Sequence, residues 1–484
     1  MFSFQKMTLV NLLLTLLGWV LLVFCVFLLP PIFIALVYEE PVVSIFSGCA
    51  FLSLFLGGAF IFAFPRPIPN QLSLSQSFLV TLFLWSVIVF LSSLPFYASL
   101  SCTFTAALFE SSSCLTTTGL TLFPHPPHFP ESLHYWRFFL QWMGGFGIVL
   151  VALTLIPALK VGGSHLIFTE FSDRFEKNTP HTATITAYLL GVYVTLTFLC
   201  TISLWFLGSP LKDSLYYGMS CVSTGGLELE HRPVSVLNVG SKLVLILFSI
   251  LGSCPFLALM TCWKERRLRS YFQNDQIKGY MKLLCFSTAI IWLWQFSHHH
   301  SADLLTPLFK SVAALSTSGM TLNMQDTGFL SLWLIFLSFI GGCSGSTAGG
   351  IKVFRLQILY RVSKREILRM IRPLYFFVTL HNKRPVSSET ISSVMTVSFL
   401  YLIAWVIFSL FFSFIRLPAY DAMMISSSLI TNTGYLLTPY IQTVQHFSTF
   451  ELWLGIIAML CGRLEFVTLL AVLVRPFSHT KAAS

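Results

Sequence analysis

The chain has 484 residues, of which 55% are apolar and 10% charged, and its mean hydropathy is +0.78. Because about a quarter of the residues in a soluble globular protein are charged, this composition excludes that class and places the chain in a bilayer. The net charge of +10 does not indicate nucleic-acid binding, because the basic residues cluster at alternate ends of apolar runs, as the positive-inside rule describes.

Two apolar runs open the chain, at residues 9–29 and 43–64, and each is about long enough to cross roughly 30 Å of hydrocarbon. The first run is too long for the core of a secretory signal and no small-residue cleavage motif follows it, so we expect it to remain as a span. Residues 1–70 are therefore predicted to form two transmembrane helices. The eleven cysteines show no paired C-x-x-C spacing, so the sequence indicates neither a disulfide framework nor a zinc site.

Beyond residue 70 the apolar runs come in pairs, and each pair encloses a short, weakly apolar stretch that ends in a Thr/Ser-Gly step. The glycines of these steps are Gly119, Gly225, Gly319 and Gly434, separated by 106, 94 and 115 residues (225−119, 319−225, 434−319). A second glycine mark follows in the next apolar run, at Gly144-Gly145, Gly252, Gly341-Gly342 and Gly462. We predict an internal fourfold repeat with segments 71–165, 166–270, 271–365 and 366–484.

The predicted fold class is an all-α polytopic membrane protein with about ten transmembrane helices and four re-entrant pore helices in a pseudo-fourfold arrangement. Non-helical backbone at membrane depth is tolerated only where it is buried in protein or lines a cavity, so four such loops imply a central pathway. Backbone carbonyls can replace the water of a dehydrated monovalent cation, and glycine permits the backbone angles that this requires. The alternative, ordinary helix breaks in a packed bundle, explains one loop better than four in phase.

A glycine-rich stretch interrupts the second apolar run of the third repeat. Five of the ten residues in 341–350 are glycine, and each costs a helix about 1 kcal/mol relative to alanine. We therefore expect the helix to break here, below the third loop. Close helix packing through small residues is the alternative, and it accounts for two or three glycines better than for five.

Three stretches stand out in the second helices of the repeats, GGCSGSTAGGIKVFR at 341–355, QWMGGFGI at 141–148 and GRLE at 462–465. They resemble the Trk/Ktr/HKT superfamily of potassium transporters, and in particular its bacterial TrkH branch. The resemblance implies potassium uptake across the inner membrane of a bacterial cell, with no cofactor in this chain. It also implies a homodimer on a cytosolic nucleotide-binding regulatory subunit of the TrkA/Ktr type, for which the basic segments 264–269 and 355–384 are candidate docking surfaces.

The same resemblance assigns roles to particular residues. Carbonyls of a selectivity filter would bind potassium at Thr117, Thr118, Gly119, Ser223, Thr224, Gly225, Thr317, Ser318, Gly319, Asn432, Thr433 and Gly434. An intramembrane gating loop would comprise Gly345, Ser346, Thr347, Ala348, Gly349 and Gly350. Tyr435 and Ser253 depart from the family pattern, at the mouth and at the helix break of the second repeat.

Ionisable side chains inside apolar runs are costly and usually functional. Glu110, Arg463 and Glu465 lie in such runs, and the family assigns to the matching arginine an electrostatic barrier beneath the filter. The alternative is that Arg463 pairs with Glu110 or with a carbonyl. Arg463 and Glu465 are two residues apart and would not face each other on a helix.

Other classes fit the sequence less well. A membrane enzyme acting on diphosphates would need clustered acidic residues for a metal site, and a proton-coupled carrier would need acidic relays and paired broken helices. Neither pattern is present, so we expect a transporter and not an enzyme. A sodium transporter of the same architecture stays open, as does the choice between channel-like and ion-coupled transport.

Overall fold

The structure, a computed structural model, describes residues 2–64, 74–123, 129–154, 182–229, 231–265, 268–299, 303–322, 328–372, 378–382, 384–415, 417–434 and 444–464. These residues are mostly helical, with one two-stranded hairpin. By packing they separate into two units. Unit 1 comprises the described parts of Met1–Ser112 and Phe123–Leu140, and unit 2 comprises Ser113–Leu122 and the described parts of Gln141–Phe466. The predicted five-part division of the chain follows different boundaries and stays a prediction.

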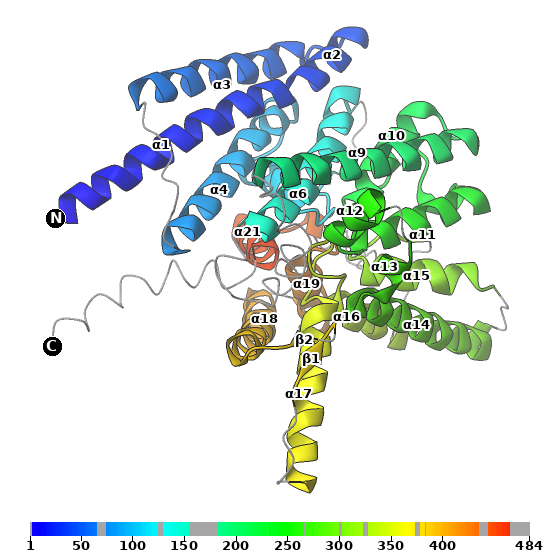
Figure 1. Ribbon diagram of the computed structural model, residues 1–484. Helices are drawn as coiled ribbons and strands as arrows, with labels where there is room; N and C mark the ends of the chain where they lie inside the picture. The colour runs from blue at the N-terminus through cyan, green and yellow to red at the C-terminus, as the bar shows by residue number, and fades with distance from the viewer. Residues whose placement is uncertain are drawn as a thin grey trace. The chain divides into compact units, whose positions relative to one another are not determined.

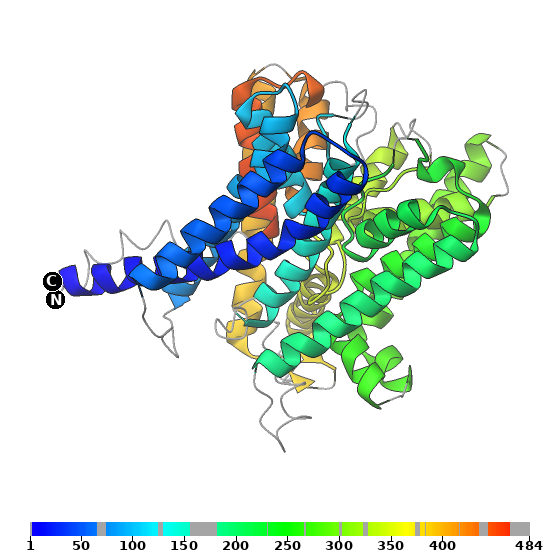
Figure 2. The same cartoon turned by 90° about the horizontal axis from the view of Figure 1, so that it is seen from above.

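Unit 1 contains the N-terminal helices. They are α1 (Phe2–Phe27), α2 (Leu29–Val37), α3 (Val43–Ala63), α4 (Leu74–Ser99), most of α5 (Phe104–Leu115) and the start of α6 (Glu131–Thr154). Helices α1 and α3 lie side by side (Figure 2). They cross at Gly18 and Gly57, where a β-carbon added to either glycine would lie 3.0 Å from the carbonyl oxygen of the other. Small residues thus allow these two helices to pack closely.

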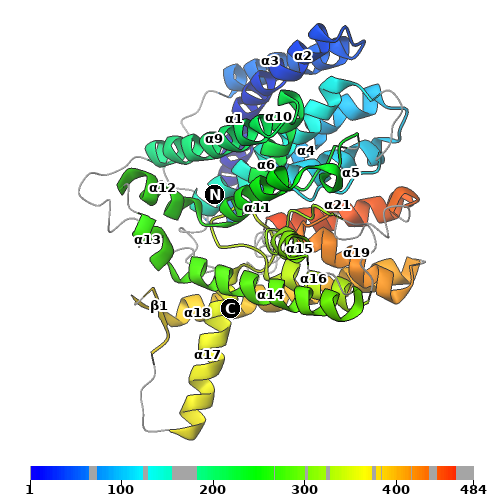
Figure 3. The same cartoon turned by 90° about the vertical axis from the view of Figure 1, so that its right-hand side faces the viewer.

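Unit 2 contains the rest of the described chain. Its helices are α9 (Thr182–Phe206), α10 (Leu211–Val222), η1 (Val234–Val236), α11 (Val239–Ser253), α12 (Phe256–Glu265), α13 (Leu268–Gln273), α14 (Asp275–His299), α15 (Leu305–Leu315), α16 (Phe329–Ile340), α17 (Val353–Ile371), α18 (Ser388–Ile415), α19 (Ala419–Thr431) and α21 (Thr449–Arg463). A long helix, a short helix and a second helix pack together in turn, as α9, α10 and α11, then α14, α15 and α16, then α18, α19 and α21 (Figure 3). This is the predicted arrangement of helix, pore helix and helix.

Five described helical segments are long and apolar enough to cross a membrane, namely Val10–Val37, Val43–Ala63, Leu79–Ser99, Ile185–Phe206 and Ser388–Ile415. The pair α11 and α12 makes a sixth if its bend is ignored. Helices α6, α14, α16 and α21 take the other positions where spans are expected, and they fall short of these criteria in length or apolarity. The chain is therefore a multi-pass membrane protein of the predicted all-α class.

In unit 2 the helix that follows the pore helix is interrupted in two repeats, the second and the third. Helices α11 and α12 are bent by 100° at Cys254-Pro255, where proline lacks the N–H that would continue the helix. Between α16 and α17 the chain leaves the helix at Gly341 and resumes it at Val353, which confirms the predicted break in the third repeat. The two interruptions are joined, because Cys343 N donates to Ser253 O at 2.9 Å and Phe256 N donates to Gly345 O at 3.0 Å.

Helix α17 extends away from the other helices of unit 2 (Figure 1). Its first half packs Phe354, Ile358 and Val362 against Val386 and the start of α18. Phe354 also contacts the ring of His381 in the hairpin of β1 (Leu380–His381) and β2 (Arg384–Pro385). A polar cluster fixes the hairpin, because Asp275 Oδ2 accepts from Arg361 Nη2 at 2.9 Å and from Asn382 N at 3.0 Å. Partial burial opposes ionisation of Asp275, but these bonds and the Arg361 charge bring its pKa below the usual value.

Candidate ion pathway

The four predicted loops share one backbone conformation. Each loop has a non-glycine residue with a left-handed φ one or two residues after its pore helix ends. These residues are Thr117 (56°), Thr224 (53°), Thr317 (53°) and Asn432 (54°). A glycine two positions later is left-handed as well: Gly119 (77°), Gly226 (76°), Gly319 (67°) and Gly434 (60°). Residues other than glycine rarely adopt this region, so its recurrence at the same two positions supports the internal repeat at atomic detail.

The backbone hydrogen bonds of the loops repeat too. The first left-handed residue donates its N–H to the carbonyl three residues earlier, from Thr117 to Cys114, Thr224 to Cys221, Thr317 to Ala314 and Asn432 to Leu429, at 3.0 to 3.4 Å. In the second repeat this fixes a register one residue later than the Thr/Ser-Gly spacing suggested. Thr224, Gly225 and Gly226 are the structural equivalents of Thr117, Thr118 and Gly119, in place of Ser223, Thr224 and Gly225. The adjacent glycines at 225 and 226 made both registers compatible with the sequence.

Close approach between neighbouring loops explains the glycine at the third position. A β-carbon on Gly119 would lie 2.1 Å from Gly225 O, and one on Gly226 would lie 1.5 Å from Ser318 O. At Gly434 it would lie 1.9 Å from Thr118 O. No side chain fits at such distances from backbone. The loops therefore lie side by side in the order fourth, first, second, third, and the glycines of the fourth, first and second loops each lie beside a carbonyl of the next loop.

Side chains brace the loops from within the protein, where nearly all of them are buried. Hydroxyl pairs join Thr116 to Thr118 at 2.8 Å, Ser316 to Ser318 at 3.0 Å and Thr431 to Thr433 at 2.7 Å. In the fourth loop Asn432 Nδ2 also donates to Thr118 Oγ1 and to Met459 O, each at 3.0 Å. The first and fourth loops are thus joined by a side-chain amide as well as by the close approach of their backbones.

The second glycine mark packs against the end of a pore helix in three repeats. A β-carbon would lie 1.8 Å from Leu115 O at Gly144, 2.8 Å from Val222 O at Gly252 and 2.0 Å from Ile430 O at Gly462. These three carbonyls occupy the same position relative to their loops. The missing side chain lets each second helix lie directly against the C-terminal end of its own pore helix.

The glycine-rich segment of the third repeat lies directly against three of the four loops. Gly349 N donates to Thr317 Oγ1 at 2.6 Å, and a β-carbon on Gly349 would lie 2.1 Å from Thr431 O. Thr347 Oγ1 bonds to Val222 O and Gly252 O, each at 3.0 Å. The segment therefore abuts the second, third and fourth loops.

The remaining residues of the expected gating loop hold its shape. Gly345 and Gly350 have φ of 76° and 77°, and Ser346 Oγ donates to Cys343 O at 2.6 Å. Ala348 is buried, and its carbonyl accepts from Lys352 Nζ. All six residues from Gly345 to Gly350 thus lie in one connected, non-helical segment.

Arg463 is buried and reaches this segment. Its Nη1 donates to Thr347 O at 2.8 Å, while Nε and Nη2 have no hydrogen-bond partner among the described residues. Glu110 pairs with Arg137 instead, at 2.9 Å, and the Arg137 guanidinium lies 4.2 Å above the Phe129 ring. Of the alternatives for Arg463, the carbonyl partner is the one observed. Glu465 lies outside the described residues, as does Tyr435.

Sequence reasoning missed Arg137 and the role of Glu228. Arg137 is the single basic residue in the aromatic run 135–139, and this position could have marked it as the partner of the buried Glu110.

Glu228 follows the second loop and joins the second repeat to the third, because its carboxylate accepts from Thr321 N at 2.8 Å and from Val234 N at 3.1 Å. Burial raises the pKa of Glu228 to about 7, although the two backbone donors lower it in part.

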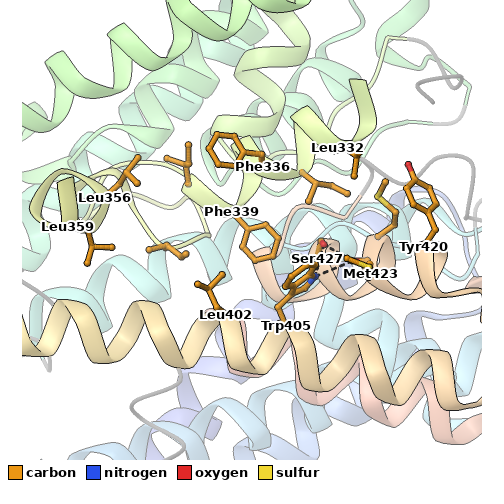
Figure 4. A pocket seen from close by; sticks show the side chains of 14 residues that line it. Leu332, Phe336, Phe339, Leu356, Leu359, Leu402, Trp405, Tyr420, Met423 and Ser427 are labelled. Carbon is orange, nitrogen blue, oxygen red and sulfur yellow. Dashed lines mark hydrogen bonds between the residues drawn. The ribbon is translucent and has the colours of Figure 1, made fainter. Parts of the chain in front are cut away.

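An apolar cavity of about 370 Å³ lies between α16, α17, α18 and α19 (Figure 4). Its lining includes Leu332, Phe336, Leu402 and Trp405, and the indole N–H of Trp405 donates to Ser427 Oγ at 2.9 Å. Apart from the hydroxyls of Tyr420 and Ser427 the lining is apolar, so it lacks the set of oxygen ligands that a dehydrated cation requires.

A family described as "TrkH: Cation transport protein" matches residues 44–296, which is more than half of the chain. The chain belongs to the TrkH family. It is 28% identical to the Trk system potassium uptake protein TrkI of Halomonas elongata over 94% of both chains, and 26% identical to TrkH of Escherichia coli over 95% of this chain and 97% of that one. The crystal structure of the potassium transporter TrkH from Vibrio parahaemolyticus matches with a TM-score of 0.86 and 25% identity, over 96% of this chain and 99% of that one.

These likenesses confirm the resemblance found in the three sequence stretches and the all-helical fold with pore-loop repeats. The TrkH family is one of cation transporters, which is not an enzyme class.

Proposed function

We propose that this protein takes up potassium across the inner (plasma) membrane of a bacterial cell, through a selectivity filter made by its four loops. The repeated left-handed backbone of these loops carries the proposal, because it gives four equivalent, buried turns, and the glycines of three of them touch neighbouring carbonyls. Carbonyl rings of this kind replace the hydration shell of a monovalent cation. The names of the relatives, potassium uptake proteins of Trk systems, support potassium as the ion.

The proposed ligands are the loop carbonyls of Thr117, Thr118 and Gly119, of Thr317, Ser318 and Gly319, and of Asn432, Thr433 and Gly434. In the second repeat they are those of Ser223, Thr224 and Gly225, with Gly226 added by the register of the backbone. Gly345 to Gly350 acts as the gate, because it is non-helical and lies against three of the loops. Arg463 acts as an electrostatic barrier beside this gate.

Potassium is the substrate, and the mechanism requires no cofactor within this chain. As partners we propose a second copy of the chain and a cytosolic nucleotide-binding subunit of the TrkA/Ktr type. The basic helix α17 supports the docking role of segment 355–384, because it extends away from the other helices of unit 2 and exposes Arg369 and Arg372. Opening of the gate would then follow from a displacement of α17, which begins three residues after Gly350.

The decisive experiment measures potassium uptake in cells that lack their own potassium uptake systems. The wild-type chain should restore growth at low potassium, and purified protein in liposomes should pass potassium in preference to sodium. Replacing Gly319 with Ser should reduce that preference, because a side chain disfavours φ of 67°. Sodium flux without a preference for potassium would favour the sodium transporter, and no cation flux at all would contradict the proposal.

A further inference from the structure

One of the four loops lacks a brace that the other three possess. The positions joined by a hydroxyl pair in the first, third and fourth loops are occupied in the second loop by Ser223 and Gly225. Glycine has no side chain, so this pair cannot form. The pairs in the other loops are buried and short, at 2.7 to 3.0 Å, so their absence would leave the second loop less constrained than its neighbours.

Gln141 occupies the place of the missing side chain. A β-carbon on Gly225 would lie 2.5 Å from both Cδ and Oε1 of Gln141 and 2.8 Å from its Nε2. Gln141 is completely buried. The φ angle of Gly225 is not in the left-handed region, so the backbone would accept a side chain here. The Gln141 amide is the group that prevents it.

The Gln141 amide also holds a carbonyl of the second loop. Its Nε2 donates to Gly225 O at 2.7 Å, and this oxygen is the one that faces Gly119 of the first loop. The orientation of the amide is fixed by chemistry, because only the NH₂ group can donate to a carbonyl. Gln141 comes from α6 of the first repeat and bonds the second loop, so one side chain fixes the contact between the first and second repeats. A carbonyl has two lone pairs, and this bond leaves one of them for an ion.

The other end of the amide has no partner. Gln141 Oε1 is buried without a hydrogen-bond donor among the described residues. An unsatisfied buried acceptor costs about 1 to 3 kcal/mol. Leucine or methionine would fill the same volume without this cost, so packing alone does not explain a glutamine here. The donor end of the amide is what leucine or methionine could not supply.

We propose that Gln141 is a specificity-determining residue of the ion pathway, which replaces the missing hydroxyl pair of the second loop and fixes the Gly225 carbonyl for selection of a dehydrated monovalent cation. This inference rests on the proposed filter function. It gives the QWMGGFGI stretch a role in selectivity in addition to the close packing that its glycines allow.

The test exchanges one brace for the other. In liposomes, Gln141→Ala should reduce the potassium-to-sodium flux ratio roughly five- to tenfold, the loss expected for one buried hydrogen bond. Gly225→Ser alone should lose most flux, because its side chain collides with Gln141. The double variant Gln141→Ala/Gly225→Ser should recover most of the wild-type ratio, since the hydroxyl introduced at position 225 can pair with Ser223 as in the other loops.

Controls separate selectivity from folding. Gln141→Leu keeps the volume and removes the donor, so it should lose selectivity with an unchanged melting temperature, while Gln295→Leu on α14 should match the wild type. A wild-type ratio in Gln141→Leu, or a double variant no better than Gln141→Ala, would overturn the inference. If Gly319→Ser changes the ratio while the Gln141 variants do not, the proposed filter stands and only the role of Gln141 fails.

Discussion

The second helices of the first and third repeats carry the same glycine mark but use it in opposite ways. In the first repeat α6 continues for ten residues beyond Gly144, to Thr154, and the glycine serves only to bring the helix against Leu115 O. In the third repeat the chain leaves the helix at Gly341 and resumes it at Val353. The number of glycines makes the difference, because the three in α6 cost a helix about 3 kcal/mol, whereas the five at 341–350 cost about 5 kcal/mol. The same glycine pattern therefore occurs in a continuous packed helix and in the segment that we propose as the gate.

The largest effect is expected where the packed span cannot tolerate a side chain. Gly144→Val places a β-carbon 1.8 Å from Leu115 O, and both elements are backbone held by their own helices. Such overpacking costs about 3 kcal/mol or more, so we expect little folded protein by size-exclusion chromatography. Gly191→Ala on α9, where a β-carbon meets nothing within 4 Å, is the matched control. Normal yield and melting temperature for Gly144→Val would contradict the packing role.

The next effect concerns Arg463, which joins the fourth repeat to the proposed gate of the third through its bond to Thr347 O. Two unit charges about 6 Å apart repel by roughly 3 kcal/mol at an effective dielectric constant near 20. Arg463→Gln should therefore raise potassium flux per folded molecule tenfold or more, whereas Arg463→Lys, which keeps the charge, should not. Flux in proteoliposomes and thermal stability are measured on the same preparation. Lower flux together with a depressed melting temperature would indicate a structural role in place of a barrier.

A smaller effect is expected from the hydrogen bonds by which Thr347 of the third repeat contacts the second repeat. Thr347→Val keeps the shape of the side chain but removes the hydroxyl that bonds Val222 O and Gly252 O. Each buried hydrogen bond contributes about 1 kcal/mol, so basal flux without the partner subunit should rise a few-fold. Thr347→Ser retains the hydroxyl and should behave as wild type. Equal basal flux in the two variants would place the gate elsewhere.

The smallest effect is expected at the β1–β2 hairpin, which packs on α17 after the glycine-rich break, and it is a dependence of hairpin stability on pH. Burial and the nearby Arg361 charge lower the pKa of His381 to about 4, and the Asp275 carboxylate raises it only in part. Neutral histidine is thus favoured in the fold. Its contribution to stability is complete above about pH 6.5 and is lost as pH falls toward 4, with about 1 kcal/mol lost at pH 5.5.

Hydrogen exchange measures this pH effect directly. Protection factors of the amides at residues 380–385 should fall between pH 7.5 and pH 5.5 in the wild type. In His381→Gln they should not change with pH, because Asp275, whose pKa lies below its usual value, stays ionised throughout this range. A wild-type hairpin whose protection is independent of pH would show that His381 does not limit its stability.

Much of this comparison could be predicted from the sequence, because glycine acts through the backbone. The positions of Gly119, Gly319 and Gly434 marked three loops, and the density at 341–350 marked the break. The register of the second loop could not be predicted, since Gly225 and Gly226 both satisfy the pattern and only the observed backbone, left-handed at Thr224 and Gly226, distinguishes them. Contacts between distant side chains, such as Gln141 with Gly225, depend on tertiary packing that no local pattern records.

The bond between Gly349 N and Thr317 Oγ1 has a thermodynamic consequence, because Thr317 belongs to the proposed filter and Gly349 to the proposed gate. Two sites that share an interaction are coupled, and the coupling free energy is the same in both directions. An ion that changes the conformation of Thr317 when it binds must change the opening equilibrium of the segment below it. Conversely, a partner that displaces the segment must change the affinity of the filter for its ion by the same factor.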